Sequence, residues 1–134
     1  MTYFRALDHE KVHVDFALVS ERKSPYYDEI RDAGGKIFVL PPVKQISAHV
    51  GECKRILAEG HYDVVHNNTL LAMAPMMWCA RQAGVPVRVL HSHNSRLGET
   101  PKKERRNKLF LPVLLSAATD YAACSRVAAA RRIR

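Results

Sequence analysis

Residues 62–95 read YDVVHNNTLLAMAPMMWCARQAGVPVRVLHSHNS, and this stretch decides the fold class. Two short runs rich in β-branched residues, 62–66 and 85–91, lie on either side of an apolar segment, 70–83, that ends at Gly84. The runs have the composition and length of strands, and the apolar segment is long enough for a buried helix. A strand, a helix and a further strand in this order predict a βαβ unit with parallel strands.

The same alternation continues on both sides of this unit. The sequence predicts further strands at 12–19, 36–40 and 119–124, and further helices at 26–33, at 46–59 and from Thr100 toward Ala117. Thr100 followed by Pro101 is typical of an N-cap with proline at the first helical position. About five strands joined by single helices predict an α/β fold with a mostly parallel sheet and helices on both faces.

The composition is that of one soluble globular domain, with 134 residues, 47% of them apolar and 25% charged. Three scattered cysteines, Cys53, Cys79 and Cys124, indicate reduced thiols rather than disulfides or a zinc site. The chain shows no signal peptide, and its longest apolar runs fall short of the roughly 20 residues that a membrane span needs. We therefore expect a cytoplasmic protein.

The positive charge is concentrated toward the C-terminus. The formal net charge is +8, and residues 96–134 hold ten Lys or Arg against three Asp or Glu. A basic segment, 102–108, precedes an apolar one, 109–115, so this region could lie on an anionic membrane or form an amphipathic helix with its basic face in water. No nucleic-acid partner is expected, because interleaved aromatic residues and known motifs are absent. The residues predicted to contact a membrane or another anion are Lys102, Lys103, Arg105, Arg106 and Lys108.

Polar side chains follow three of the predicted strands, where a parallel α/β sheet gathers its ligands. Such side chains suit sugar hydroxyls or phosphate oxygens, although they could equally cap helices and satisfy strand ends. His91 and His93 could in principle bind a metal, but no cysteine pair or carboxylate stands at ligand spacing, so we expect none. The predicted binding residues are His66, Asn67, Asn68, His91, His93, Asn94, Ser95 and Ser125.

Motifs of nucleotide and hydrolase chemistry are absent from the sequence. It contains no G-x-G-x-x-G, no G-x-x-x-x-G-K-[ST] and no G-x-S-x-G. A dinucleotide-binding fingerprint, a P-loop and a nucleophile elbow are therefore excluded.

Four runs carry a resemblance to a known family: Tyr62–His66, Ala83–Arg88, His91–Asn94 and Ala118–Ser125. Their order and spacing resemble the N-terminal half of bacterial glycosyltransferases of family four, the GT-B enzymes that build capsular polysaccharides and exopolysaccharides. The resemblance extends from about Tyr3 to Ser125. We therefore assign residues 1–125 to the glycosyltransferase N-terminal domain and leave 126–134 as a basic tail.

The resemblance implies a Rossmann-like three-layer domain that forms half of a GT-B architecture. Such enzymes transfer a hexosyl group from a nucleotide sugar with retention and need no metal or other cofactor. By the same resemblance, His93 is the catalytic histidine that faces the donor sugar and its phosphates. The basic helix would dock on the inner face of the plasma membrane, near a lipid-linked or polysaccharide acceptor. The acceptor side would be lined by His66, Asn67, Asn68, Asn94 and Ser95.

The sequence also departs from the family pattern. Family members begin with one more strand, which lies in the middle of the sheet, and continue into a donor-binding second domain. A Glu commonly follows the Cys-Ser pair, but Arg126 stands here. We therefore expect a chain truncated at both ends, inactive by itself and prone to self-association through unpaired strand edges.

Two other functions stay open at the level of sequence. A nucleotide-sugar epimerase shares the two-domain architecture and would use a different set of acid and base residues. Alternatively, the chain is a non-catalytic module whose basic segment binds membranes or polyanions.

Overall fold

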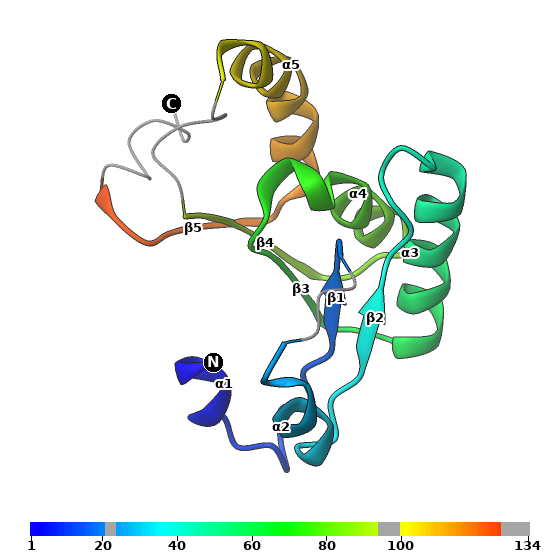
Figure 1. Ribbon diagram of the computed structural model, residues 1–134, viewed down its shortest axis with the longest axis vertical. Helices are drawn as coiled ribbons and strands as arrows, with labels where there is room; N and C mark the ends of the chain where they lie inside the picture. The colour runs from blue at the N-terminus through cyan, green and yellow to red at the C-terminus, as the bar shows by residue number, and fades with distance from the viewer. Residues whose placement is uncertain (21–23, 94–99, 127–134) are drawn as a thin grey trace. The chain divides into compact units, whose positions relative to one another are not determined.

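The computed structural model describes residues 1–20, 24–93 and 100–126 (Figure 1). The chain divides into two compact units, Met1–Gln45 and Ile46–Arg134, and each is described by itself. The predicted tail, 126–134, lies outside the described residues except for Arg126, and the predicted boundary at residue 125 stays a prediction.

The first unit is a small βαβ arrangement with two parallel strands. Phe16 pairs with Ile37, and Leu18 pairs with Val39. The turn after its second helix needs glycine, because Gly34 has φ +81°. The elements are α1 (Thr2–Arg5), β1 (Phe16–Leu18), α2 (Tyr27–Asp32) and β2 (Ile37–Val39).

The second unit contains a three-stranded parallel sheet in the order β3-β4-β5. Helices lie between successive strands along the chain, as the crossover connections of parallel strands require (Figure 1). The elements are α3 (Ile46–Gly60), β3 (Val64–Asn67), the 3₁₀ helix η1 (Leu70–Met73), α4 (Ala74–Gln82), β4 (Val87–Ser92), α5 (Pro101–Ala117) and β5 (Asp120–Ala123).

The core of the second unit forms where α4 and α5 meet the sheet. Met77 of α4, Leu90 of β4 and both Leu114 and Ala117 of α5 pack together, each at most 4% exposed. Partly buried side chains from β3, η1 and the same helices surround this cluster. The central strand is thus covered by two helices that precede and follow it in the sequence.

A half-buried arginine ties the central strand to the end of α5. Arg88 Nε donates to the carbonyl oxygen of Ala117 at 2.6 Å, and its Nη1 donates to the carbonyl oxygen of Val85. The backbone N–H of Arg88 donates to Thr119 Oγ1 at 2.7 Å. The bond to Ala117 satisfies a carbonyl group at the C-terminal end of α5, where carbonyls have no partner within the helix.

The fold class predicted from the sequence is confirmed. The structure is α/β and Rossmann-like, with five parallel strands that alternate with helices. In the described residues the strands form a two-stranded and a three-stranded sheet, so β1 pairs only with β2 and β3 pairs only with β4.

Two predicted elements differ clearly from the structure. The expected strand at 12–19 shortens to β1, and the expected helix at 70–83 becomes η1 followed by α4. Pro75 stands in the first turn of α4, where its missing N–H costs nothing, so the helix restarts there. The short α1 was not predicted.

The buried cluster gives a test of the core. Replacing Met77 with alanine removes a fully buried side chain and should lower the free energy of unfolding by about 2–5 kcal/mol in urea denaturation. Met77→Leu preserves the volume and should cost less than about 1.5 kcal/mol. Equal effects of the two substitutions would show that this position is not part of a tightly packed core.

Candidate functional site

The carboxyl ends of β3, β4 and β5 lie at one edge of the three-stranded sheet. His66 is near the end of β3, and His91 is near the end of β4. Directly after β5 in the sequence, the backbone N–H of Cys124 donates to the carbonyl oxygen of Ser92 at 3.2 Å, so the pairing with β4 continues past the end of the strand. Parallel pairing therefore brings together polar residues that are about 25 and 55 positions apart in the sequence.

Three histidines form a row of neighbouring rings at this edge, which we call the histidine row: His66, His91 and His93. The rings of His66 and His91 stack with centroids 5.2 Å apart, and those of His91 and His93 stack at 4.1 Å. His66 Nε2 lies 3.1 Å from His91 Nδ1, so one of these nitrogens donates to the other. The sequence predicted these residues for the site, and the structure places them in contact.

Asn68 extends the row on the β3 side. Its Oδ1 lies 3.1 Å from Nε2 of His93, which is exposed at the end of β4. The backbone carbonyl oxygen of His93 accepts a weak hydrogen bond from Cys124 Sγ at 3.4 Å. His93 is therefore held through both its ring and its backbone. The Cys124 contact escaped the sequence analysis, because no pattern indicates a bond across 31 residues.

Asn67 and Ser92 point to the other side of the sheet from the histidine row, as alternation along a strand requires. They are 3% and 6% exposed. Asn67 Oδ1 accepts from the backbone N–H of Thr69 at 2.9 Å, and this bond forms the turn that leads into η1. The amide oxygen of Asn67 thus has a structural partner, while its predicted contact with substrate stays a prediction.

The remaining predicted binding residues are placed as follows. Ser125 is exposed and follows β5 at the same edge of the sheet. Asn94 and Ser95 lie outside the described residues. Among the side chains that the structure describes, no three His, Cys, Asp or Glu residues are arranged to hold a metal ion.

Two rings of the histidine row, those of His66 and His91, favour the neutral form. Burial lowers the pKa of His66 below its ordinary value of 6.5, and nearby His91 and His93 lower it further. Burial, followed by the effect of His93, also lowers the pKa of His91. Adjacent imidazoles resist protonation because each positive ring disfavours the next. At neutral pH the rings of His66 and His91 therefore offer lone pairs and N–H groups rather than positive charge.

The three cysteines differ sharply in accessibility. Cys53 and Cys79 are buried, and Cys124 is exposed. Burial raises the pKa of the Cys53 thiol to about 12 and also raises that of Cys79. Deprotonation of the two buried thiols is therefore strongly disfavoured, and both behave as small apolar core residues.

The basic helix predicted after Thr100 is present as α5. Thr100 Oγ1 accepts from the backbone N–H of Lys103 at 3.3 Å, which confirms the predicted N-cap. A hollow of about 970 Å³ lies against the first half of this helix, and its lining includes the aliphatic side chains of Pro101 and Leu109. The basic residues that line it are Lys102, Arg105 and Lys108.

The outward face of α5 is apolar beyond its basic first half. Leu109, Phe110 and Val113 are 73%, 52% and 55% exposed. Lys102, Arg105, Leu109 and Val113 follow one another at spacings of three or four residues, so they share one face of the helix. We call these four residues the α5 outer face. No helix in the described parts of the chain has both the length and the apolar character to cross a bilayer.

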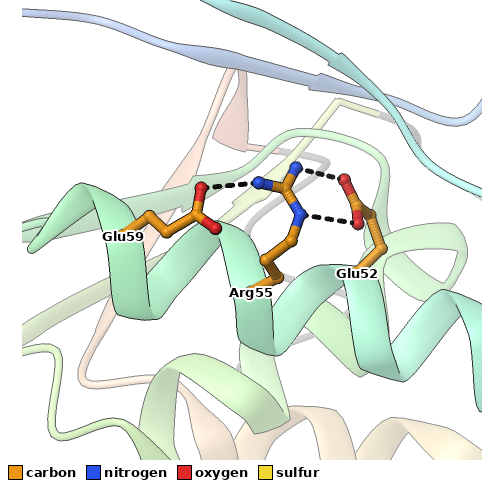
Figure 2. A network of polar contacts seen from close by, with 3 residues as sticks. All are labelled: Glu52, Arg55 and Glu59. Carbon is orange, nitrogen blue, oxygen red and sulfur yellow. Dashed lines mark hydrogen bonds and ion pairs between the residues drawn. The ribbon is translucent and has the colours of Figure 1, made fainter.

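Two carboxylates away from the sheet edge, Glu52 and Glu59, form ion pairs within α3. Figure 2 shows Arg55 between Glu52 and Glu59, with Arg55 Nε 2.9 Å from Glu52 Oε2. The hydrogen bond from Arg55 holds the pKa of Glu52 below its usual range. Pairs at these spacings stabilise a helix by a few tenths of a kcal/mol each. The network therefore explains these two glutamates without a catalytic role.

The parallel sheet and its neighbouring helices define a Rossmann-like α/β domain with a polar carboxyl edge. The whole chain, residues 1–134, matches the family described as "Glycosyl transferase 4-like domain", and it belongs to that family. The resemblance stated from the sequence is therefore confirmed.

A relative from Bacillus subtilis (strain 168) is named "Putative glycosyltransferase EpsF". It is 33% identical over 129 residues, which cover 92% of this chain and 34% of the relative. The chain thus spans about a third of the length of that protein. No solved structure was found to match the chain.

The lowered pKa values of His66 and His91 predict how stability depends on pH. Below about pH 6.5 the unfolded chain binds protons on these rings more readily than the folded chain does. The free energy of unfolding should therefore be lower at pH 5.5 than at pH 7.5 in urea denaturation. Carboxylates such as Glu52 act in a separate window, below their ordinary value of 4.5.

A double substitution, His66→Gln with His91→Gln, should reduce this pH dependence. The matched control is His13→Gln, because His13 is exposed and belongs to the other unit. An unchanged pH dependence in the double variant would contradict the electrostatic account of the histidine row.

Proposed function

We propose that the chain is the acceptor-side domain of a retaining glycosyltransferase. The enzyme would transfer a hexosyl group from a nucleotide sugar to a cell-surface polysaccharide, such as an exopolysaccharide, or to a lipid-linked acceptor. The observation that carries the proposal is the histidine row with Asn68, at the carboxyl edge of a domain of this family. The relative from Bacillus subtilis is named a glycosyltransferase, which supports glycosyl transfer rather than epimerisation of a nucleotide sugar.

The site chemistry suits a sugar and its phosphates. A neutral imidazole accepts a hydrogen bond from a hydroxyl group, and a protonated one donates to a phosphate oxygen. We assign this contact with the donor to His93, which is exposed at the end of β4. The reaction would proceed without a metal ion, so a chelator should leave it unchanged. The residues that we propose to bind substrate with His93 are His66, Asn67, Asn68, His91, Asn94, Ser95 and Ser125.

The 134 residues alone should be inactive in transfer. They match about a third of the relative, and the proposed donor-binding half would have to come from elsewhere. In the described residues β1 and β3 each pair on one side only, so each leaves backbone groups available to another strand. We infer that these edges promote self-association of the isolated chain.

We also propose that the α5 outer face rests on the cytoplasmic side of an anionic membrane. Its lysine and arginine side chains complement lipid phosphates, and the exposed Leu109 and Val113 continue the same face. Such a helix lies in the plane of the membrane surface without crossing it. This contact would place the histidine row near a lipid-linked acceptor.

Transfer is testable in a chimera in which this chain replaces the matching third of EpsF. Labelled nucleotide sugars would be offered with membranes as the source of acceptor, and polymer-bound label would be measured. His93→Ala should lower the rate by about 100-fold, the magnitude typical of losing one group that stabilises developing charge. His13→Ala is the control, because it removes an exposed histidine from the other unit.

Two outcomes would overturn the proposed reaction. One is interconversion of the nucleotide sugar without transfer, which would indicate an epimerase. The other is equal transfer by the His93→Ala chimera and the unaltered chimera. The isolated chain, with its oligomeric state determined by sedimentation velocity, should transfer no label.

Membrane contact is testable with vesicles of phosphatidylcholine, prepared with and without phosphatidylglycerol. Reversing three charges, in Lys102→Glu, Arg105→Glu and Lys108→Glu together, should lower partitioning onto the anionic vesicles by about 100-fold or more. Each basic residue near such a surface contributes about 1 kcal/mol. The neutral vesicles should bind the unaltered chain weakly.

The control changes net charge by the same amount elsewhere. Lys36, Lys44 and Lys54 are exposed and lie outside α5, and their joint replacement by Glu should have a much smaller effect. Equal losses in the two triple variants would mean that overall charge, and not the α5 outer face, drives binding.

A further inference from the structure

Two side chains near the end of β3 reach across to two rings near the end of β4. His66 lies in β3 and Asn68 directly follows its last residue, and His91 lies in β4 and His93 directly follows its last residue. The contacts join His66 to His91 and Asn68 to His93, both at 3.1 Å. The two contacts differ in chemistry, because the first joins two ring nitrogens and the second joins a ring nitrogen to an oxygen.

The oxygen decides where the proton of His93 lies. Asn68 Oδ1 is an amide oxygen, which accepts hydrogen bonds and cannot donate one. The bond therefore requires a hydrogen on His93 Nε2. In the neutral ring this leaves Nδ1 as the lone-pair nitrogen, since an uncharged imidazole carries only one N–H.

The ring plane of His93 is fixed by a second, independent contact. The ring stacks on His91 with centroids 4.1 Å apart and planes inclined by 25°. His91 in turn is bonded to His66, so the stacking surface is itself oriented. Stacking restricts the plane, and the bond that His93 donates to Asn68 restricts rotation of the ring within that plane.

We infer that Asn68 is a positioning residue that selects the Nε2–H tautomer of His93 and so presents Nδ1 as the acceptor nitrogen in the proposed site. The inference rests on the proposed function only for its consequence, because the tautomer itself is a property of the chain. In this role Asn68 acts on the substrate through His93. In histidines that act in binding or catalysis, the hydrogen bond made by one ring nitrogen commonly decides which nitrogen carries the proton.

The alternative is that the contact is an ordinary surface hydrogen bond. Such a bond would contribute little to stability and would leave the ring as the mixture of two tautomers that a free histidine side chain shows, with Nε2–H the major but not the sole form. The two interpretations therefore differ in the state of the ring and not in the stability of the fold.

The test is nuclear magnetic resonance of the full 134-residue chain with ¹⁵N-labelled histidine rings, at a pH where the rings are neutral. We expect Nε2 of His93 to give the signal of a protonated nitrogen and Nδ1 that of a lone-pair nitrogen. The Nε2 proton should be directly visible, because a hydrogen-bonded ring proton exchanges slowly with water. A protonated Nδ1 in the unaltered chain would overturn the inference outright.

Two variants separate positioning from mere contact. Asn68→Ala should abolish the visible Nε2 proton and shift the tautomer ratio to that of a free imidazole. Asn68→Asp retains an oxygen acceptor at the same position, so it should keep both the Nε2–H tautomer and the visible proton. Identical His93 signals in Asn68→Ala and the unaltered chain would contradict the role of Asn68.

The His66 and His91 signals serve as the internal control for folding, since they should persist in both variants. If Asn68→Ala fails to fold, the unaltered chain and Asn68→Asp still decide the tautomer. No sugar or transfer step enters the experiment, so it can fail while the proposed glycosyl transfer stands, and the reverse is equally true.

Discussion

The parallel pairing of β3 with β4 is the constraint on which the candidate site depends. It sets His66 opposite Val89 and Asn67 opposite Leu90, so that the ends of the two strands meet where His66 contacts His91 and Asn68 contacts His93. A slip of one residue would turn each side chain of β3 to the other face and would bury His66 in place of Asn67. Leu90 prevents such a slip from the β4 side, because it is 4% exposed in the core cluster and directly precedes His91.

The same central strand links the candidate site to the basic helix. Arg88 bonds to the carbonyl oxygen of Ala117, and Leu114 of α5 packs against Leu90. The position of α5 against the sheet is therefore set by both apolar packing and hydrogen bonds. Because the helix and the histidine row belong to one compact unit, a contact made by the α5 outer face fixes the orientation of the sheet edge as well.

Much of the fold could be predicted from local patterns, because strand propensity, apolar spacing and helix capping each depend on residues close together in the sequence. The βαβ unit at 62–95 follows from two β-branched runs around an apolar segment, and Thr100 with Pro101 marks the start of α5. Periodicity could not reveal that β1 has only three strand residues, since pairing with β2 decides its length. Periodicity also could not reveal that the helical segment divides into η1 and α4 near Pro75, because this division depends on the preceding turn at Asn67.

The candidate site was predictable in its residue types and less so in its contacts. Strand ends identified His66, His91 and His93 because a parallel sheet gathers such ends at one edge. The same logic chose Asn67, but the alternation of strand faces buries it and directs its oxygen to Thr69. Contacts between residues 25 positions apart follow from register, which only the folded chain displays.

The unequal burial of the thiols makes the chain chemically addressable at a single position. Cys53 and Cys79 are buried, whereas Cys124 is exposed and its sulfur contacts the backbone carbonyl oxygen of His93. A thiol-reactive fluorophore would therefore attach at Cys124 without removal of any other cysteine. The attached dye would sit beside the histidine row, where its emission would report directly on whatever occupies that edge of the sheet.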